Sequence, residues 1–235
     1  MRMWMRCQAF HEDGSFLTCE TLLPGDPSED KELIFMYDLR RSVTAQGLQP
    51  ISQFTGHNDM ITCLAVSPKA PNLFISGSKD LTVRLWDRRS PPSAVVMLGS
   101  QESGKENPQA HSKLVTSLDM DPNDPNTIYS SGADLRVCQW DLRKGTTAAS
   151  TKLFDKHPWK VAASSEKDNV AVCTSNALLY VNMATQTAIP ATIPGRAAGK
   201  LDAVGRYHTI KWDHSSKQLY AGSSAHHVDR YNLLG

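Results

Sequence analysis

The chain lacks several features that would point to a particular class of protein. It contains no apolar run near the roughly 20 residues that a membrane-spanning helix needs. Lys plus Arg number 25 against 24 for Asp plus Glu, so the net charge of +1 gives no global attraction to nucleic acid or to an anionic membrane. The segment Met1–Cys7 is too short and too strand-like for a secretory signal peptide. We therefore expect a cytoplasmic or nuclear location and no membrane partner.

Cysteine is scarce and widely spaced. The five cysteines form no CxxC pair for zinc or redox chemistry, and each falls in a segment that we expect to be a strand: Cys7, Cys19, Cys63, Cys138 and Cys173. We interpret them as reduced thiols in the core. His226 and His227 are adjacent, so in a strand they would point to opposite faces and would not share a metal ion. The sequence predicts no metal and no other cofactor.

Two stretches of the chain repeat each other without a gap, Met60–Asp87 and Leu114–Asp141. A histidine precedes each stretch, and the interval from that histidine to the tryptophan of the stretch is the same in both copies. The interval from an aspartate to the same tryptophan is also identical. Self-similarity of this kind indicates stacked units, because one unit cannot bury both of its faces alone.

Each copy reads as a series of short strands separated by turns. In the first copy the strands are expected to begin near Ile61, to cover Phe74–Ser78 and to cover Leu81–Asp87, with a fourth strand near Ala94–Leu98. The polar stretch Ser100–Gln109 is expected to be a solvated loop. The sequence thus predicts units of four antiparallel strands.

These repeats resemble those of the WD-repeat β-propeller family. The resemblance implies a buried hydrogen-bond relay in each blade, made by a histidine, a serine, a turn aspartate and a tryptophan. Carried over by position, the relay residues are His57, Ser76, Asp80 and Trp86 in one unit, and His111, Ser130, Asp134 and Trp140 in the next. A buried indole, imidazole and carboxylate each need a partner, so such a relay would fix the geometry of a blade.

The same residue types also occur in the catalytic triad of serine hydrolases. Their duplication with identical spacing favours a structural role, because an enzyme needs one triad and not two. A five-bladed, glycosidase-like enzyme would need paired carboxylates at the propeller axis, whereas the recognisable aspartates lie in turns. We therefore predict that the protein has no catalytic residues.

Three further units are degenerate copies of the pattern. The expected fold is all-β, a propeller of about five four-stranded blades within a single domain, and the expected units are residues 1–55, 56–109, 110–155, 156–198 and 199–235. In the last unit Trp212-Asp213 falls on the first strand and is not a repeat signature, whereas Tyr231-Asn232 occupies the Trp-Asp place.

The number of units implies an incomplete ring. Propellers of this family usually close with seven blades, and neither terminus supplies the fourth strand that would close five. An open ring would leave two sheet edges and two apolar faces in water. We expect missing blades or a partner chain to close it, and we expect the strand at Val228–Asn232 to present an open edge beside Tyr220.

An arginine follows the Trp-Asp dipeptide in both copies, at Arg89 and Arg143, and Arg40 follows a Tyr-Asp dipeptide with the same spacing. The Trp-Asp-x-Arg pattern resembles that of substrate receptors that dock on the propeller adaptor of cullin-RING ubiquitin ligases. An arginine fork can bind a partner carboxylate or carbonyl groups in this way. The alternative is that each arginine pairs with an aspartate of a neighbouring blade.

A second candidate surface is the rim where the tight turns converge. Its expected partner-binding residues are Asn58, Asp59, Lys79 and Lys113. The basic positions Lys152, Lys156, Lys160, Arg196 and Lys200 lack interleaved aromatic residues, so nucleic-acid binding is not favoured.

The sequence as a whole predicts a non-enzymatic scaffold that holds other proteins in a complex. Two alternatives stay open, a substrate receptor of a cullin-RING ubiquitin ligase and a scaffold subunit of an RNA-containing machine.

Overall fold

The computed structural model describes most of the chain. The described residues are 4–10, 13–21, 32–41, 47–67, 69–99, 101–102, 105–106, 109–152, 157–174, 177–190, 207–215, 217–223 and 228–232. All regular secondary structure within these ranges is β-strand. The described residues contain no helix that could span a membrane.

Four antiparallel sheets contain four strands each, and a fifth sheet contains three among the described residues. In each sheet the strands follow one another in chain order, so every sheet is a meander, and we number these sheets blade 1 to blade 5. Blade 1 comprises β1 (Trp4–Phe10), β2 (Ser15–Thr21), β3 (Glu32–Asp38) and β4 (Ser52–Thr55); blade 2 comprises β5 (Ile61–Val66), β6 (Leu73–Ser78), β7 (Val83–Asp87) and β8 (Val96–Leu98). Blade 3 comprises β11 (Val115–Met120), β12 (Thr127–Gly132), β13 (Arg136–Asp141) and β14 (Thr146–Lys152); blade 4 comprises β15 (Pro158–Ala163), β16 (Asn169–Thr174), β17 (Leu178–Asn182) and β18 (Thr187–Pro190); blade 5 comprises β19 (Tyr207–Asp213), β20 (Gln218–Ser223) and β21 (Val228–Asn232).

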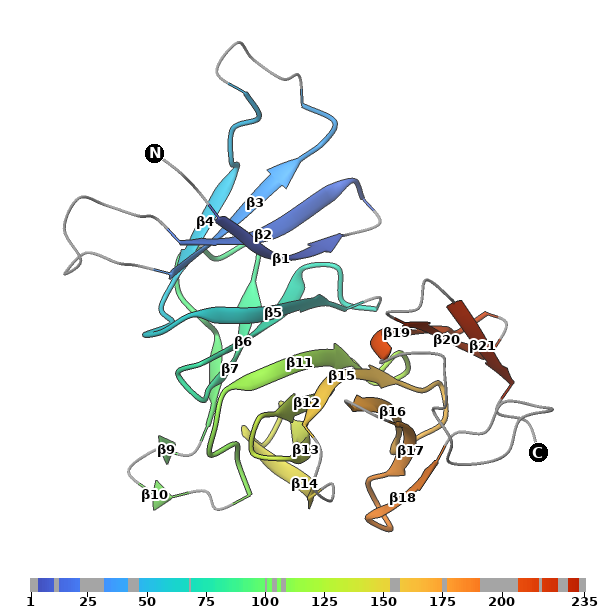
Figure 1. The fold of residues 1–235 in the computed structure, drawn as a ribbon. Helices are drawn as coiled ribbons and strands as arrows, with labels where there is room; N and C mark the ends of the chain where they lie inside the picture. Colours follow the sequence, from blue (N-terminus) through green and yellow to red (C-terminus); the bar gives the residue numbers. More distant parts are fainter. Residues whose placement is uncertain are drawn as a thin grey trace.

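The predicted all-β propeller architecture is confirmed. Figure 1 shows the blades side by side along an arc, with blade 1 at the top and blade 5 on the right. Among the described strands, none of blade 1 pairs with one of blade 5. Trp212 lies on β19, the first strand of its blade, as the sequence predicted.

Two details of the predicted strands were wrong. The stretch expected to be a loop at Ser100–Gln109 contains the short hairpin strands β9 (Gln101–Glu102) and β10 (Lys105–Glu106). The third strand of blade 2 begins at Val83 and not at Leu81, because Leu81 has a φ of 70° and belongs to the turn. Leu135, at the same place in blade 3, has a φ of 69°. A left-handed conformation cannot continue a strand.

Local hydrogen bonds explain why the turns fall where they do. The Ser67 hydroxyl accepts the backbone N–H groups of Lys69 and Ala70. The Asp121 carboxylate, at the equivalent position of blade 3, accepts two backbone N–H groups in the same way. Short polar side chains that bind nearby backbone amides favour turns over strands. Each of these turns joins the first strand of its blade to the second.

The blades stack through one repeated contact. The first strand of every blade carries a bulge at its second or third residue. Side chains of each blade then donate a hydrogen bond to a first-strand carbonyl of the next blade: Cys19 to Ile61, Thr62 to Val115, Thr116 to Pro158 and Cys173 to Tyr207. Bulges bend and twist a strand locally. Here the bulge is a constant feature of the innermost strand.

The hydrophobic core lies between the blades and not inside any one of them. A separate cluster of buried side chains fills each junction, from blades 1 and 2 to blades 4 and 5. All five cysteines are free and lie on strands, and all but Cys7 are buried, as predicted for core thiols. Sheets packed on both faces need apolar residues at successive positions. This agrees with the unbroken runs of buried residues in the second strands of blades 2, 3 and 4.

Candidate functional site

The structure brings the four predicted relay residues of blade 2 together. The Nε2 atom of His57 lies 2.6 Å from the Ser76 Oγ, and its Nδ1 lies 2.8 Å from Asp80 Oδ2. The indole N–H of Trp86 donates to the same Ser76 Oγ at 2.8 Å. Ser76 and Trp86 are fully buried, so the hydroxyl joins two buried rings.

Blade 3 repeats this geometry. His111 Nε2 lies 2.7 Å from the Ser130 Oγ, and its Nδ1 lies 3.1 Å from each carboxylate oxygen of Asp134. Trp140 donates to Ser130 at 2.7 Å. The aspartate comes from the turn after the second strand, and the tryptophan comes from the third strand. Each relay therefore links the entry segment of its blade to the second and third strands.

Electrostatics favour an ionised aspartate in each relay. Burial alone would raise the pKa of Asp80, but hydrogen bonds from His57, Thr82 and the backbone amide of Asn58 lower it below its usual value. The pKa of Asp134 is lowered in the same way. Burial lowers the pKa of His57, and the carboxylate offsets this only in part.

The buried position of the serines does not suit a hydrolase. A nucleophilic serine must reach a substrate carbonyl. Ser76 and Ser130 are fully buried, and each hydroxyl is already bonded to a histidine and a tryptophan. The relay geometry therefore suits structural support.

Some members of the polar network were not predicted from the sequence. In blade 2, Thr82 donates to Asp80 at 2.6 Å, and Arg84 lies 3.5 Å from the same carboxylate. In blade 5, the Tyr207 hydroxyl lies 2.6 Å from Asp229 and 2.6 Å from the Tyr231 hydroxyl. Tyr231 occupies the Trp-Asp place of its unit, but the positions equivalent to Tyr207 in the close repeats hold Ile61 and Val115, so the repeat pattern did not predict this cluster.

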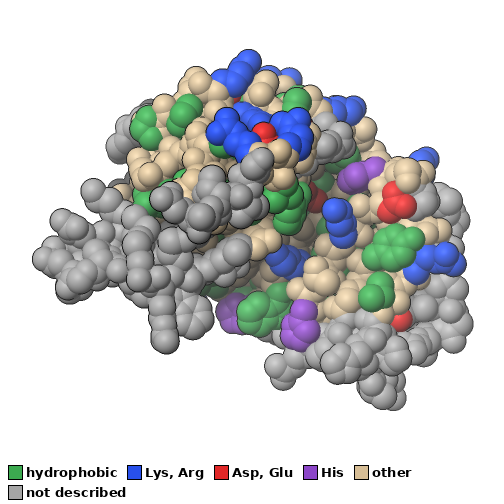
Figure 2. All heavy atoms as spheres, turned by 90° about the horizontal axis from the view of Figure 1, so that it is seen from above, with side chains coloured by type: hydrophobic (Ala, Val, Ile, Leu, Met, Phe, Trp, Pro, Cys, Tyr) green, Lys and Arg blue, Asp and Glu red, His purple; other side chains and the backbone are tan. Residues whose placement is uncertain are grey.

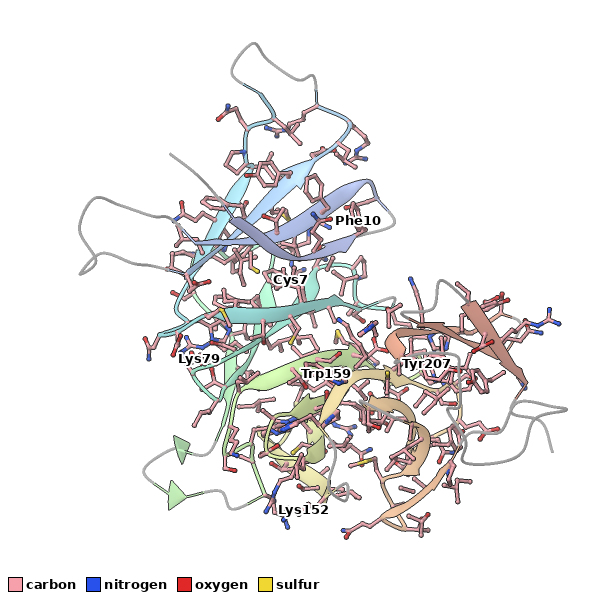
Figure 3. All side chains as sticks on the ribbon, viewed as in Figure 1. Cys7, Phe10, Lys79, Lys152, Trp159 and Tyr207 are labelled. Atoms are coloured by element: carbon pink, nitrogen blue, oxygen red, sulfur yellow. The ribbon has the colours of Figure 1, made fainter. Side chains whose placement is uncertain are left out.

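The relay turns and the arginines occupy opposite faces of the arc. In an antiparallel meander, the start of the first strand and the end of the second lie at one end of the blade, and the end of the third lies at the other. The first end carries the predicted rim residues, of which Asn58, Lys79 and Lys113 are exposed and Asp59 is partly exposed. Lys79 and Asp59 form an ion pair of 3.3 Å, and Figure 3 labels Lys79 at the left of the arc.

The three arginines share one conformation at the opposite end. Each lies two positions after the aspartate that ends a third strand, and each side chain folds back onto that aspartate. The Nε–Oδ1 distances are 3.0 Å for Arg40, 3.0 Å for Arg89 and 3.2 Å for Arg143. The backbone amide of each arginine donates to the same carboxylate. We call these three groups the arginine clips.

Among the described residues, no aspartate of a neighbouring blade pairs with these arginines, which was the alternative that the sequence allowed. The nearest carboxylate is their own, because an aspartate two positions before can hold both the backbone amide and the side chain. Hydrogen bonds from Arg89 lower the pKa of Asp87 to about 2. The arginine side chains nevertheless remain 64–67% exposed. Figure 2 shows a cluster of basic side chains around an acidic group near the upper edge of that view.

Comparison with known proteins agrees with this geometry. A family model described as "WD domain, G-beta repeat" matches residues 48–87 and 105–141. The chain carries WD repeats. It is 26% identical over 149 residues to a guanine nucleotide-binding protein subunit beta of Arabidopsis thaliana, which covers 63% of this chain and 36% of the relative.

Two other relatives match shorter parts of the chain. Polycomb group protein FIE2 of Zea mays is 32% identical over 39% of this chain and 22% of its own length. Histone acetyltransferase type B subunit 2 of Candida glabrata is 29% identical over 48% of this chain and 31% of its own length. The matched part of the WD-repeat chain thus spans about a third or less of these relatives.

The WD-repeat blades also surround a central space. A cavity of about 740 Å³ is lined by the first strands of all five blades. Lys160 and Lys211 contribute basic groups to it, and Asp119 contributes a carboxylate whose pKa burial raises to about 6. Both oxygens of Asp119 accept backbone amides, from Met120 and from Ala163 of the next blade. This aspartate therefore helps to join blades 3 and 4.

Some positions discussed above lie outside the described residues. They are His226 and His227, and the basic residues Lys156, Arg196 and Lys200. Within the described residues, the features that bear on function are the two faces of the arc, the relays and the central space.

Breaking one relay should destabilise the WD-repeat fold. Asp134→Ala removes the acceptor of His111 and of the Ser112 amide, and we expect the free energy of unfolding to fall by about 1–3 kcal/mol. Asp59→Ala, on the same face but 42% exposed, is the control and should change it by less than about 0.5 kcal/mol. Urea unfolding measures both. Equal midpoints for the parent and Asp134→Ala would contradict a structural relay.

Proposed function

We propose that this WD-repeat chain is a non-enzymatic scaffold that holds other proteins within a larger complex in the cytoplasm or the nucleus. The observation that carries the proposal is the row of three exposed arginine clips on one face of three consecutive blades. Two of the relatives carry the word "subunit" in their names, which supports membership of a complex. Free, mostly buried thiols are in keeping with a reducing compartment.

The finer proposal is docking on the propeller adaptor of a cullin-RING ubiquitin ligase. Each clip holds the guanidinium by one edge and leaves most of the side chain in solvent, which suits bidentate binding of a carboxylate or of carbonyl groups. Because the aspartate fixes the side chain beforehand, a partner would lose less conformational freedom on binding. The same pre-ordering would serve any acidic partner of the scaffold.

The test removes two of the three clips, those of Arg89 and Arg143, without touching the core. We expect Arg89→Ala with Arg143→Ala to abolish binding of the purified ligase adaptor and to leave the melting temperature nearly unchanged, since both side chains are largely exposed. Biolayer interferometry measures the first and thermal unfolding the second. Lys79→Ala, on the opposite face, is the control. Undiminished binding by the double variant, or none by the parent, would contradict the ligase proposal.

A separate experiment tests the broader proposal that the chain is a scaffold for other proteins. The same double variant and the parent, both tagged, are purified from cells and their stoichiometric partners compared by mass spectrometry. We expect the variant to lose at least one partner that the parent retains. A parent that elutes alone at the size of one chain would contradict the scaffold role.

We further propose that another blade packs on the outer face of blade 1. In each of blades 2 to 5, directly opposed residues of neighbouring strands form a row of side chains that is buried against the preceding blade. Examples are Phe74 and Trp86 in blade 2, and Leu219 and Tyr231 in blade 5. The same row in blade 1 is Phe10, Phe16 and Tyr37.

The aromatic rings of this row in blade 1 contact one another, but these contacts cover the row only in part. Phe16 stacks on Phe10 at 5.6 Å and on Tyr37 at 5.2 Å, yet Phe10 remains 60% exposed. In Figure 3, Phe10 lies at the right-hand side of blade 1, facing the open part of the arc. The opposite end of the arc exposes Tyr220 and Val228, the latter to 72%. Two exposed apolar faces support a ring that further blades complete.

A further inference from the structure

Two of the five cysteines meet across one pair of strands. Cys7 of β1 and Cys19 of β2 are direct partners in the register, next to the bulge between Met5 and Cys7. Their sulfur atoms are 2.6 Å apart, and both residues are free thiols. A disulfide needs its two Cα atoms within about 7 Å of each other, a condition that directly opposed residues of an antiparallel pair meet.

The other three cysteines have different surroundings. The Cys63 sulfur contacts the Thr62 hydroxyl, the Cys138 sulfur contacts the carbonyl of Gln109, and the Cys173 sulfur contacts the carbonyl of Tyr207. Each of these contacts joins sulfur to oxygen. The Cys7 and Cys19 contact joins sulfur to sulfur.

The two thiols differ in access. Cys19 is fully buried and donates to the carbonyl of Ile61 in blade 2 at 3.6 Å. Cys7 is half-buried and lies on the first strand of the arc. Figure 3 shows Cys7 between β1 and β5, at the junction of blades 1 and 2. Cys7 is therefore the more accessible of the two cysteines, although it packs against the same core cluster as Cys19.

We propose that Cys7 and Cys19 form a reversible disulfide that staples β1 to β2, with Cys7 as the attacking thiol and Cys19 as the resolving thiol. The co-reactant is a low-molecular-weight disulfide of the glutathione type. The Cys7 thiolate attacks one sulfur of that disulfide and releases one small thiol, which leaves a mixed disulfide on Cys7. The Cys19 sulfur then attacks Cys7 and releases the second small thiol.

Atoms and electrons balance in this exchange. The two protein thiols lose their hydrogens, the small disulfide gains them as two thiols, and two electrons pass to it. Excess reduced thiol reverses both steps. The Cβ atoms of residues directly opposite each other in an antiparallel pair lie slightly farther apart than an unstrained disulfide prefers, which favours a bond that is easily reduced.

The disulfide would change the junction of blades 1 and 2. Cys19 would lose the proton that it donates to Ile61, while β1 would be tied covalently to β2. The hydrogen bond to Cys19 and burial both raise the pKa of Cys7, so the exchange should be slow at neutral pH and faster in mildly alkaline solution.

The full chain is incubated with oxidised glutathione, alkylated, digested and analysed by mass spectrometry. We expect one cross-linked peptide that joins Cys7 to Cys19 and disappears on reduction, with Cys63, Cys138 and Cys173 alkylated only after unfolding. Five alkylatable thiols after oxidation would overturn the proposal. So would a stable mixed disulfide on Cys7 in the parent chain, or a link from Cys7 to Cys63.

Single variants separate the two roles. Cys19→Ser should stop at the glutathione adduct of Cys7, whereas Cys7→Ser should leave Cys19 unmodified because Cys19 is buried. Cys138→Ser is the control and should form the cross-link as the parent does. An adduct on Cys19 in the Cys7→Ser variant would reverse the assignment of attacking and resolving thiols. The cross-link in the parent chain decides the proposal even if a variant fails to fold.

Discussion

Trp86→Ala should lower the free energy of unfolding by about 3–5 kcal/mol, the range for removing a large aromatic side chain from a core. Trp86 is fully buried between blades 1 and 2, with ring centroids 6.0 Å from both Phe54 and Phe74. Its loss leaves a cavity at a blade junction and also removes the indole donor to Ser76. This one substitution therefore lowers the free energy of unfolding in two separate ways.

A second variant separates the loss of the hydrogen bond from the loss of packing, and a third variant is the control. Trp86→Phe keeps most of the packing but removes the N–H donor, so its cost should lie near the range of about 1–3 kcal/mol for an unpaired buried group. Trp159 is 49% exposed, and Trp159→Ala should therefore cost much less. Urea denaturation measures the free energy of unfolding of all three variants, and the slope of that free energy against urea concentration should be unchanged. Equal costs for Trp86→Ala and Trp159→Ala would show that the blade junctions do not hold the fold together.

The purified chain should associate with itself as its concentration rises. Strand β21 pairs with β20 on one side, and its other edge has no partner among the described strands and lies beside the exposed Val228. At the other end of the arc, Phe10 is 60% exposed. Open edges and apolar faces favour pairing with another chain. Light scattering should give an average mass that rises above that of one chain.

Charges at the two ends should reduce this association. Phe10→Lys combined with Val228→Lys is expected to restore a mass close to one chain, because each lysine makes burial of its face unfavourable. Val95→Lys replaces a residue that is 56% exposed but lies on neither end face, and it should leave association unchanged. A parent chain that stays monomeric at every concentration would rule out exposed end faces.

The duplicated stretch carried most of the information about the fold. Because the spacing of His57, Asp80 and Trp86 recurs in the second copy, the strand order of blades 2 and 3 could be predicted, whereas the relay itself was implied by the resemblance to the WD-repeat family. Strands in the degenerate units could also be placed, including Trp212 on a first strand, because alternation and turn residues remain when the signature is lost. Figure 1 shows these degenerate blades stacked like the others.

The sequence by itself determined the all-β repeat architecture, since short-range spacing fixes strands and turns. Only the tertiary structure decided which side chains meet: that Arg89 folds onto Asp87, that Tyr207 joins Asp229, and that Cys7 faces Cys19. Such contacts depend on strand register and on the stacking of blades, and a shift of one residue would turn each side chain to the opposite face. Left-handed turn residues such as Leu81 were likewise fixed by the contacts around the turn and not by their own preference.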